Sequence, residues 1–516
     1  MGAVWGIGIA LVVGLVGGKG LTGTRVMVAS GVVIGVVTWV VGGVGQVGVG
    51  EWWSEGEVRA LVMVGESGVQ MFLLTGVSAG VWAWGEWYMG EDGRGQGLVG
   101  WLMVFSGAMG LVMEGLDMLT LVVGWEGIGY ASYRLIGYQE ERGEASRAGV
   151  KAVAWNRVGD IGMVLSMAGI VGRFGDGYLG TAGSGWEGLG ILAGVWAKSA
   201  QVGMQGWLLD AMEGPTPVSS LLHSATLVCA GVVVLEKGRE VWGGSEVGVV
   251  VMGGMTAVVG TMGALGHMDI KRVVAFSTMV HVGVMVCGVG AGGESGEHML
   301  LHGLGKAGLF MVVGGMLHEV HEQDVRRVTG RGLAVGVLGA IMLGIGGQAG
   351  TVVGASKEWL LEQGGQEAGD IVGTVGLVTV GSVAYSIGVW TLTGNMGEGG
   401  RSTGGRAHWV YMWGMGLGAA WAWAEAGAWH EGQQEATEVG THGGTWALGG
   451  LAAWATGIGT AREHSSTGRR ALGTATRRHY WDRIWALGAL RAAGTTARMV
   501  RDIEYGLWQV WVRVTV

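Results

Sequence analysis

The sequence predicts an all-α polytopic membrane protein with about fifteen transmembrane helices. Hydrophobic residues fill 49% of the 516 positions and charged residues only 14%, a composition outside that of ordinary soluble domains. Apolar runs of roughly 20 residues, the length needed to cross about 30 Å of hydrocarbon, recur from end to end. The runs lack the alternation of barrel strands, and a helix satisfies the backbone of such a segment internally.

The predicted spans follow one another along the whole chain. In order they are 3–18, 26–49, 69–89, 98–113, 117–137, 150–172, 189–208, 219–235, 247–266, 273–291, 298–318, 332–354, 371–393, 408–428 and 445–459. The first, within MGAVWGIGIALVVGLVGG, has neither the basic region and cleavage pattern of a secretory signal nor the Arg/Ser richness of a transit peptide. We therefore expect it to be a spanning helix.

Glycine fills 110 positions and proline only two. A glycine costs a helix interior about 1 kcal/mol relative to alanine in water, so this content needs an explanation. Close packing of helices through small residues is one. The joint abundance of Gly, Val, Trp and Met favours another, a mutational bias toward G-rich codons. The two cysteines, Cys229 and Cys287, lie in apolar runs and indicate small core residues, with no disulfide framework and no thiolate metal site.

Ionisable side chains in or beside the apolar runs are the candidate functional residues, because they are costly in a bilayer and mark ion pathways. In chain order they are Glu126, Asp160, Lys198, His223, His281, His298, His302, Lys306, Lys357 and Glu358. Arg157 lies three residues before Asp160, so a static ion pair is the alternative there. We expect His281 to be a satisfied polar core residue, and Lys357 with Glu358 could instead reach the membrane interface.

One candidate group is spaced for a single helix face. His298, His302 and Lys306 are four residues apart, so their side chains stack along nearly one face, where imidazole and a desolvated amine can pass a proton. The i, i+4 histidines also match a helical metal pair. The residues between them lack a catalytic glutamate and no third ligand is evident, so we expect no metal.

Two interrupted runs predict an internal repeat. Lys198 precedes the weakly helical QVGMQGW, and LGIGGQAGTVVGA precedes Lys357. Interrupted helices at corresponding positions of two halves are typical of transporters, with the ion path at the interruption. The candidate inverted repeats are 98–235 and 245–393.

Both prolines lie in MEGPTPVSSLLH, residues 212–223. Pro215 and Pro217 lack the backbone N–H and have a fixed φ, which ends one helix and suits the first turn of the next. This pattern predicts a joint between two helices, with His223 about two turns into the second.

Five segments together carry a resemblance to a known family. They are GWEGIGYASYRLIGY (124–138), KSAQVGMQGWLLDAMEGPTPVSSLLHSATLVCAG (198–231), DIKRVVAFSTMVHVGVM (269–285), HMLLHGLGKAGLFMVVGGMLH (298–318) and EQDVRRVTGRGL (322–333). In order and spacing they resemble the antiporter-like subunits of respiratory complex I, NADH:ubiquinone oxidoreductase, and within them the chain 5 group. The resemblance covers roughly residues 98–390, and the remainder is similar by hydropathy only.

The resemblance implies a proton-pumping subunit of a translocating NADH:ubiquinone reductase, with no redox centre in this chain. NADH, FMN, iron–sulfur clusters and ubiquinone are then expected in other subunits. The expected partners are other membrane-arm and accessory subunits and lipids, with no nucleic acid and no soluble small-molecule substrate. The expected location is the mitochondrial inner membrane, as a multi-pass, organelle-encoded protein, with a bacterial plasma membrane as the alternative.

Carried over residue by residue, the resemblance also implies a proton relay. The roles fall on Glu126 and Lys198 as a coupled carboxylate–lysine pair, Asp160 as an auxiliary acid, His223 as a bridge toward the centre, His302 and Lys306 as the central relay, and Lys357 with Glu358 as the terminal lysine site.

The sequence departs from the family pattern in several places. Val280–His281 stands where the family has Ser–Gln, which puts a titratable group where an amide is usual. Trp207–Leu208–Leu209 lacks the family's proline, and Tyr385–Ser386 is followed by Ile387–Gly388 where an arginine is usual close by. Residues 461–516 resemble the lead-in to the family's long lateral helix but leave no room for both that helix and a final anchor. Either the subunit is truncated or another polypeptide completes it.

Five regions are predicted in consequence. They are N-terminal transmembrane helices (1–97), a first repeat (98–235), a second repeat (245–393), C-terminal transmembrane helices (394–460), and a basic loop with an amphipathic C-terminal helix (461–516). Two other functions stay open at this stage. One is the large subunit of a multisubunit sodium/proton antiporter, and the other is a non-pumping scaffold whose ion pairs are static.

Overall fold

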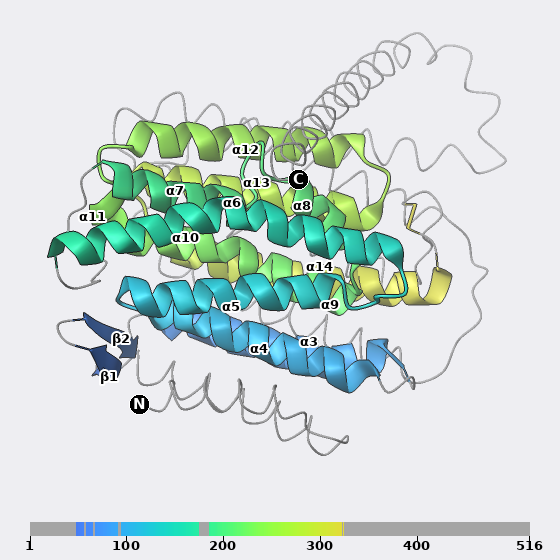
Figure 1. Cartoon of the computed structure of the whole chain (residues 1–516). Coiled ribbons are helices and arrows are strands. Elements are labelled where there is room, and N and C mark those ends of the chain that lie inside the picture. Colours follow the sequence, from blue (N-terminus) through green and yellow to red (C-terminus); the bar gives the residue numbers. More distant parts are fainter. Residues whose placement is uncertain are drawn as a thin grey trace, which may run out of the picture.

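A computed structural model describes residues 48–55, 58–64, 68–90, 94–174, 185–321, 323 and 324. Most of this part is a bundle of long helices with nearly parallel axes (Figure 1). The helices are α3 (Gly68–Tyr88), α4 (Arg94–Glu114), α5 (Met118–Ile136), α6 (Gly143–Phe174), α7 (Trp186–Lys198), α8 (Gly206–Asp210), the 3₁₀ turn η1 (Ala211–Glu213), α9 (Thr216–Ser224), α10 (Leu227–Lys237), α11 (Arg239–Trp242), α12 (Glu246–Gly266), α13 (Ile270–Gly290) and α14 (Gly296–Val320).

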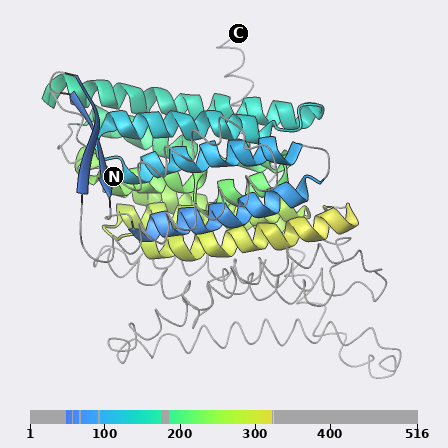
Figure 2. The same cartoon turned by 90° about the horizontal axis from the view of Figure 1, so that it is seen from below.

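The bundle has a wholly buried centre and an apolar outside. In Figure 1, α12 lies along one side and α3 with α4 along the other, and Figure 2 shows α14 (yellow) on the side away from α6 (teal). Every residue of α9 is buried, as are all but Arg272 on α13, whereas α6, α7 and α12 expose large apolar side chains. Exposed apolar surface on helices of this length is what a bilayer or another membrane subunit covers.

Membrane-length helices are present in the described ranges. Five helical segments there are long and apolar enough to cross a membrane: Arg94–Glu114, Thr216–Lys237, Glu246–Gly266, Ile270–Gly290 and Gly296–His318. Each falls on a span predicted from the sequence, and the chain is a membrane protein. The total of fifteen spans stays a prediction, because the predicted spans 3–18 and 26–49 (apart from residues 48 and 49) and those from residue 332 onward lie outside the described residues.

The prediction of an all-α chain needs one correction. Strands β1 (Gly48–Glu55) and β2 (Val58–Val64) pair antiparallel, from Gly48 opposite Val64 to Glu55 opposite Val58, with an irregularity between Glu51 and Trp53. The segment GVGEWWSEGEVRALVMV is rich in valine and tryptophan, which favour strands, and a glycine lies between its two halves. Strand propensity therefore forms a hairpin in the connection between the predicted spans 26–49 and 69–89, and only residues 48 and 49 of a predicted span fall in a strand.

The interruption predicted after Lys198 is present. Helix α7 ends at that residue, and the chain leaves the helical path before α8 begins. Side chains pair backbone carbonyls that the break leaves open: Trp207 Nε1 donates to the Ala197 carbonyl at 3.0 Å, and Gln201 Nε2 to the Ser199 carbonyl at 2.9 Å. This pairing is required where no water can bind the carbonyls.

The next span is also interrupted, which the sequence analysis did not predict. Helix α9 ends at Ser224 and α10 begins at Leu227. Thr226 Oγ1 donates to the Leu221 carbonyl at 2.6 Å, which satisfies one carbonyl beside the break. His223 lies about two turns into α9, as predicted, and one residue before the helix ends.

The predicted joint at MEGPTP is present and is held by a lysine of another helix. Pro215 is the N-cap residue of α9 and Pro217 lies in its first turn. The buried Lys271 of α13 donates from Nζ to the carbonyls of Met212, at 2.5 Å, and Gly214, at 3.0 Å. A cation here therefore binds the carbonyls that the proline-induced stop leaves without helical partners.

Glu213, the central residue of the joint, adds two ion pairs. Its carboxylate lies 2.9 Å from Arg142 Nη2, just before α6, and 3.7 Å from Arg272 Nη2 on α13. The joint thus connects α6, α9 and α13 at one end of the bundle.

Glycine permits the close contact between α12 and α13. A Cβ at Gly283 would lie 2.7 Å from both the Ala257 nitrogen and the Gly253 carbonyl oxygen, and a Cβ at Gly253 would overlap the backbone at Cys287 and Gly283. Gly248, also on α12, has open space around it. Small-residue packing is therefore required at some glycines and not at others, so the high glycine content is not explained by packing alone.

Replacing Gly253 by valine should separate α12 from α13. The added side chain meets backbone atoms, which cannot move aside as a flexible side chain can, so a cost of about 1–3 kcal/mol or more is expected. The thermal unfolding midpoint of the detergent-solubilised protein measures it, with Gly248→Val as the control on the same helix. Equal midpoints for the two variants would contradict the packing described here.

Candidate functional site

The first charged cluster lies where α5, α6 and α7 meet. Lys198 is completely buried, and its Nζ donates to Asp160 Oδ1 at 3.0 Å and to the Trp125 carbonyl at 2.7 Å. The ammonium also lies 4.3 Å from the centroid of the Trp125 ring, close enough for a cation–π contact. Trp125 Nε1 donates to the same Asp160 oxygen at 2.6 Å. The ion pair is therefore hydrogen-bonded on both sides.

Local structure explains this placement. Lys198 is the last residue of α7, where the partial negative charge of the helix end favours a cation. Gly129 on α5 leaves room for it, because a Cβ there would lie 3.4 Å from Nζ. Helix α5 itself begins at the capping residue Asp117, whose side chain accepts from the Thr120 backbone N–H at 2.9 Å.

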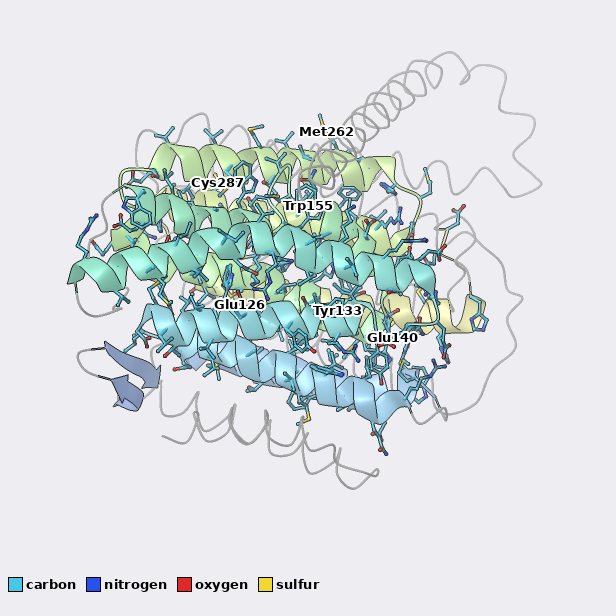
Figure 3. All side chains as sticks on the ribbon, viewed as in Figure 1. Glu126, Tyr133, Glu140, Trp155, Met262 and Cys287 are labelled. Carbon is cyan, nitrogen blue, oxygen red and sulfur yellow. The ribbon has the colours of Figure 1, made fainter. Side chains whose placement is uncertain are left out.

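The coupling of Glu126 with Lys198 stays a prediction, because the direct ion pair of Glu126 in the structure is with Arg157. Glu126 projects between α5 and α6 (Figure 3), and its Oε2 lies 2.5 Å from Arg157 Nη1. Arg157 also lies 3.9 Å from Asp160 Oδ2, so the static pair considered for Asp160 is the weaker of that arginine's two contacts. The four side chains form a series, Glu126–Arg157–Asp160–Lys198, in which Asp160 is the direct partner of the lysine.

The series runs from the flank of the bundle to its interior. The Arg157 and Glu126 side chains are 50% and 29% exposed, whereas Asp160 and Lys198 are 4% and 0%. Sequence spacing identified the charged residues but could not give this order, because it depends on how α5 and α6 are rotated toward α7.

His223 lies apart from that cluster. It is completely buried on α9, with its ring 5.1 Å from the Phe310 ring on α14, and neither ring nitrogen has a hydrogen-bond partner among the described residues. Ser199, next to Lys198, donates from Oγ to the Val228 carbonyl at 2.8 Å and so connects the end of α7 to α10. The structure therefore places His223 against α14, and no hydrogen bond among the described residues joins it to Lys198.

A second cluster lies where α13 meets α14. Lys306 is completely buried and donates from Nζ to the Val274 carbonyl at 3.2 Å and to the Ser277 hydroxyl. His302, one turn away, is also buried, and neither of its ring nitrogens has a partner among the described residues. The shared face predicted for His298, His302 and Lys306 is consistent with their common burial on α14.

His281 is a buried polar core residue with a polar partner, as predicted, and it also lies beside two of the candidate histidines. It is buried on α13, and its Nδ1 lies 3.1 Å from Nε2 of His298, within hydrogen-bond distance. Its ring centroid is 5.3 Å from those of both His298 and His302. The signal that could have identified it was the departure from the family motif, an imidazole in place of an amide.

The remaining predicted site residues, Lys357 and Glu358, lie outside the described residues. Within the described ranges, no three His, Cys, Asp or Glu side chains are arranged to hold a metal ion. Carboxylate, amine and imidazole groups are the ones that bind and release protons in proteins.

These observations define the class of protein: a polytopic membrane protein with ionisable side chains buried at bilayer depth, the class that includes proton and ion translocators. Residues 115–342 match the family described as NADH:quinone oxidoreductase/Mrp antiporter, transmembrane. Over these residues the chain is similar to that family, and the resemblance predicted from the motifs is confirmed.

Individual relatives agree with the family match. The chain is 36% identical over 340 residues to NADH-quinone oxidoreductase subunit L of Mycobacterium tuberculosis, which covers 61% of this chain and 54% of the relative. It is 39% identical over 255 residues to NADH-ubiquinone oxidoreductase chain 5 of Branchiostoma lanceolatum, covering 47% of this chain and 43% of the relative. The chain thus spans about half the length of the curated relatives it matches.

A solved structure has the same fold. The Mrp complex from Dietzia sp. DQ12-45-1b aligns with a TM-score of 0.65 and 20% sequence identity, covering 96% of this chain and 63% of that one. At this identity the likeness concerns the fold.

A double-mutant cycle tests which carboxylate holds Lys198. Lys198→Met and Asp160→Asn should each lower the free energy of unfolding by about 3–5 kcal/mol, because each leaves a buried charge without its partner. The double variant should lose less than the sum, with a coupling energy of about 1–3 kcal/mol. Unfolding in mixed detergent micelles measures these values.

Glu126→Gln provides the matched control for that cycle. Because its carboxylate contacts Arg157 and reaches Lys198 only through the series, its coupling energy with Lys198→Met should be smaller than that of Asp160→Asn. Stronger coupling of Lys198 to Glu126 than to Asp160 would contradict the series described above.

Proposed function

We propose that the chain is a proton-translocating membrane subunit of the respiratory NADH:ubiquinone oxidoreductase, complex I. The observation that carries the proposal is the buried Asp160–Lys198 ion pair at the point where α7 ends. Such a pair is costly to bury and adds little to stability over apolar packing, so a functional role accounts for it better than a structural one.

The proposed mechanism uses the pair as a switch. A conformational signal from quinone chemistry in another subunit changes the charge pairing along Glu126, Arg157 and Asp160. A lysine ammonium that loses its carboxylate in a buried site is destabilised, and Lys198 therefore gives up its proton. When the carboxylate returns, the amine takes up a proton again.

Onward transfer runs through the second cluster. Water molecules carry the proton from Lys198 toward His223, and then to His302 and Lys306. The terminal site of the proposed relay is Lys357 with Glu358. The ring nitrogens of His223 and His302 have no hydrogen-bond partner among the described residues, which supports this route, since a relay group must have nitrogens available to exchange protons.

The proposal includes partners and location. NADH, FMN, iron–sulfur clusters and ubiquinone belong to other subunits, and this chain contacts membrane-arm and accessory subunits and lipids. Relatives named chain 5 in Branchiostoma lanceolatum and Chlamydomonas reinhardtii support the mitochondrial inner membrane. The subunit L relative of Mycobacterium tuberculosis supports a bacterial membrane as the alternative.

A second candidate is the large subunit of a multisubunit sodium/proton antiporter. The fold likeness to the Dietzia Mrp complex favours it. In that case the same Asp160–Lys198 pair would couple proton movement to sodium movement and not to NADH oxidation. A third candidate, a non-pumping scaffold, would use the pair only to hold α6 against α7.

Lys198→Met in the reconstituted complex tests the three candidates. We expect NADH-driven proton translocation per NADH oxidised to fall, because the buried proton-exchanging amine is gone. Acidification of the vesicle lumen, measured together with NADH consumption, gives this ratio. Lys151→Met is the matched control, because Lys151 is a partly exposed lysine paired with Asp210 near the end of α8.

Each rival predicts a different result. An unchanged ratio in an assembled Lys198→Met complex would contradict the proposal. Sodium-dependent proton exchange without any response to NADH would favour the antiporter, and failed assembly with no selective change in the ratio would favour the scaffold.

A further inference from the structure

The three buried histidines His281, His298 and His302 form one cluster across two helices. His298 and His302 lie four residues apart on α14, which places them about 6 Å apart along the helix axis. His281 reaches them from α13, with its ring centroid 5.3 Å from each of the other two. It therefore lies beside His302, a residue of the proposed relay, and beside His298, which that relay does not include.

One contact within the cluster is suited to proton exchange. The 3.1 Å between His281 Nδ1 and His298 Nε2 is a hydrogen bond in which one imidazole must donate and the other accept. The pair shares one proton between these two nitrogens. Such a bond lets a proton added to one ring leave from the other.

Lys306 and the histidines of the cluster on α14 lie in order along the helix, from its interior to its first turn. Lys306 lies ten residues into α14, while His298 is in its first turn, next to the exposed Glu297. Just before this turn, Ser295 donates from its backbone nitrogen and hydroxyl to Glu236 at 2.5 and 2.6 Å. A path from Lys306 to His298 thus runs from the interior of the bundle to the end where α14 begins.

We propose that His281 is a relay residue that joins His302 to His298 and extends the proton path to this end of the bundle. A proton from the His302 side adds to Nε2 of His281, after a side-chain rotation or across one water molecule. The proton on Nδ1 then moves to Nε2 of His298, and His298 releases a proton from Nδ1. No charge accumulates, because each ring gives up one proton for each that it receives.

This inference rests on the proposed proton translocation, so its test compares variants in the assembled complex. His281→Gln keeps an amide able to hydrogen-bond His298 but cannot carry a proton through a ring. We expect it to lower the ratio of protons translocated to NADH oxidised by the same factor as His302→Gln. His267→Gln, which changes a histidine at the end of α12 outside the cluster, should leave the ratio unchanged.

Lys306→Met separates failure of this inference from failure of the proposed function. If Lys306→Met lowers the ratio and His281→Gln does not, His281 is a structural residue and the inference is wrong. If neither variant changes the ratio, the proposed translocation itself is wrong.

A spectroscopic measurement tests the shared proton independently of pumping. In membranes with ¹⁵N-labelled histidine, a coupling across the hydrogen bond between the His281 and His298 nitrogens should appear and should vanish in both His281→Gln and His298→Gln. Its absence from the unaltered protein would overturn the inference even if a variant failed to assemble.

Discussion

The need to pair the Lys198 ammonium away from water constrains the structure around it. Three helices contribute to this pairing. Helix α6 supplies the Asp160 carboxylate, α5 supplies the Trp125 carbonyl and ring, and α7 supplies Lys198 as its last residue. An ammonium at this depth has no other source of compensation. The interrupted helix, the glycine at 129 and the indole that supports the carboxylate are all consequences of this one requirement.

Charged groups in the bundle are of two kinds. The lysines at its ends donate hydrogen bonds to backbone carbonyls. Lys271 donates to two carbonyls of the MEGPTP joint, and Lys237 donates to the carbonyls of Val112, Met113 and Gly115 at the end of α4. Near the middle, His223 and His302 are buried with no hydrogen-bond partner among the described residues. The first kind holds helix ends in place, and the second leaves nitrogens available for exchange. Beside the Asp160–Lys198 pair, this contrast supports a functional role for the middle of the bundle and a structural role for its ends.

The sequence was sufficient for five membrane-length helical segments in the described part, the interruption after Lys198 and the joint at the two prolines. Each of these follows from local rules on hydrophobic length, helix propensity and proline geometry. The partner of Lys198 and the role of His281 did not follow, because they depend on the rotation of helices against one another. The break between α9 and α10 was also not predicted, because Ala225 and Thr226 resemble residues of an ordinary apolar run. The Thr226 side chain pairs the Leu221 carbonyl beside the break only once the chain has folded. The β1–β2 pair lies between two predicted spans, and it follows from a local strand propensity that the all-α prediction did not take into account.

The anchoring of residues 199–205 has a mechanical consequence. Ser199, Gln201 and Trp207 fix the backbone on both sides of the break by hydrogen bonds to carbonyls, and Thr256 Oγ1 accepts from the Val202 nitrogen at 3.0 Å. These hydrogen bonds hold the backbone beside Lys198 in place, whereas its four-carbon side chain can change rotamer. A displacement of a few ångströms at one amine, without any helix sliding or unwinding, is then sufficient to break the contact with Asp160.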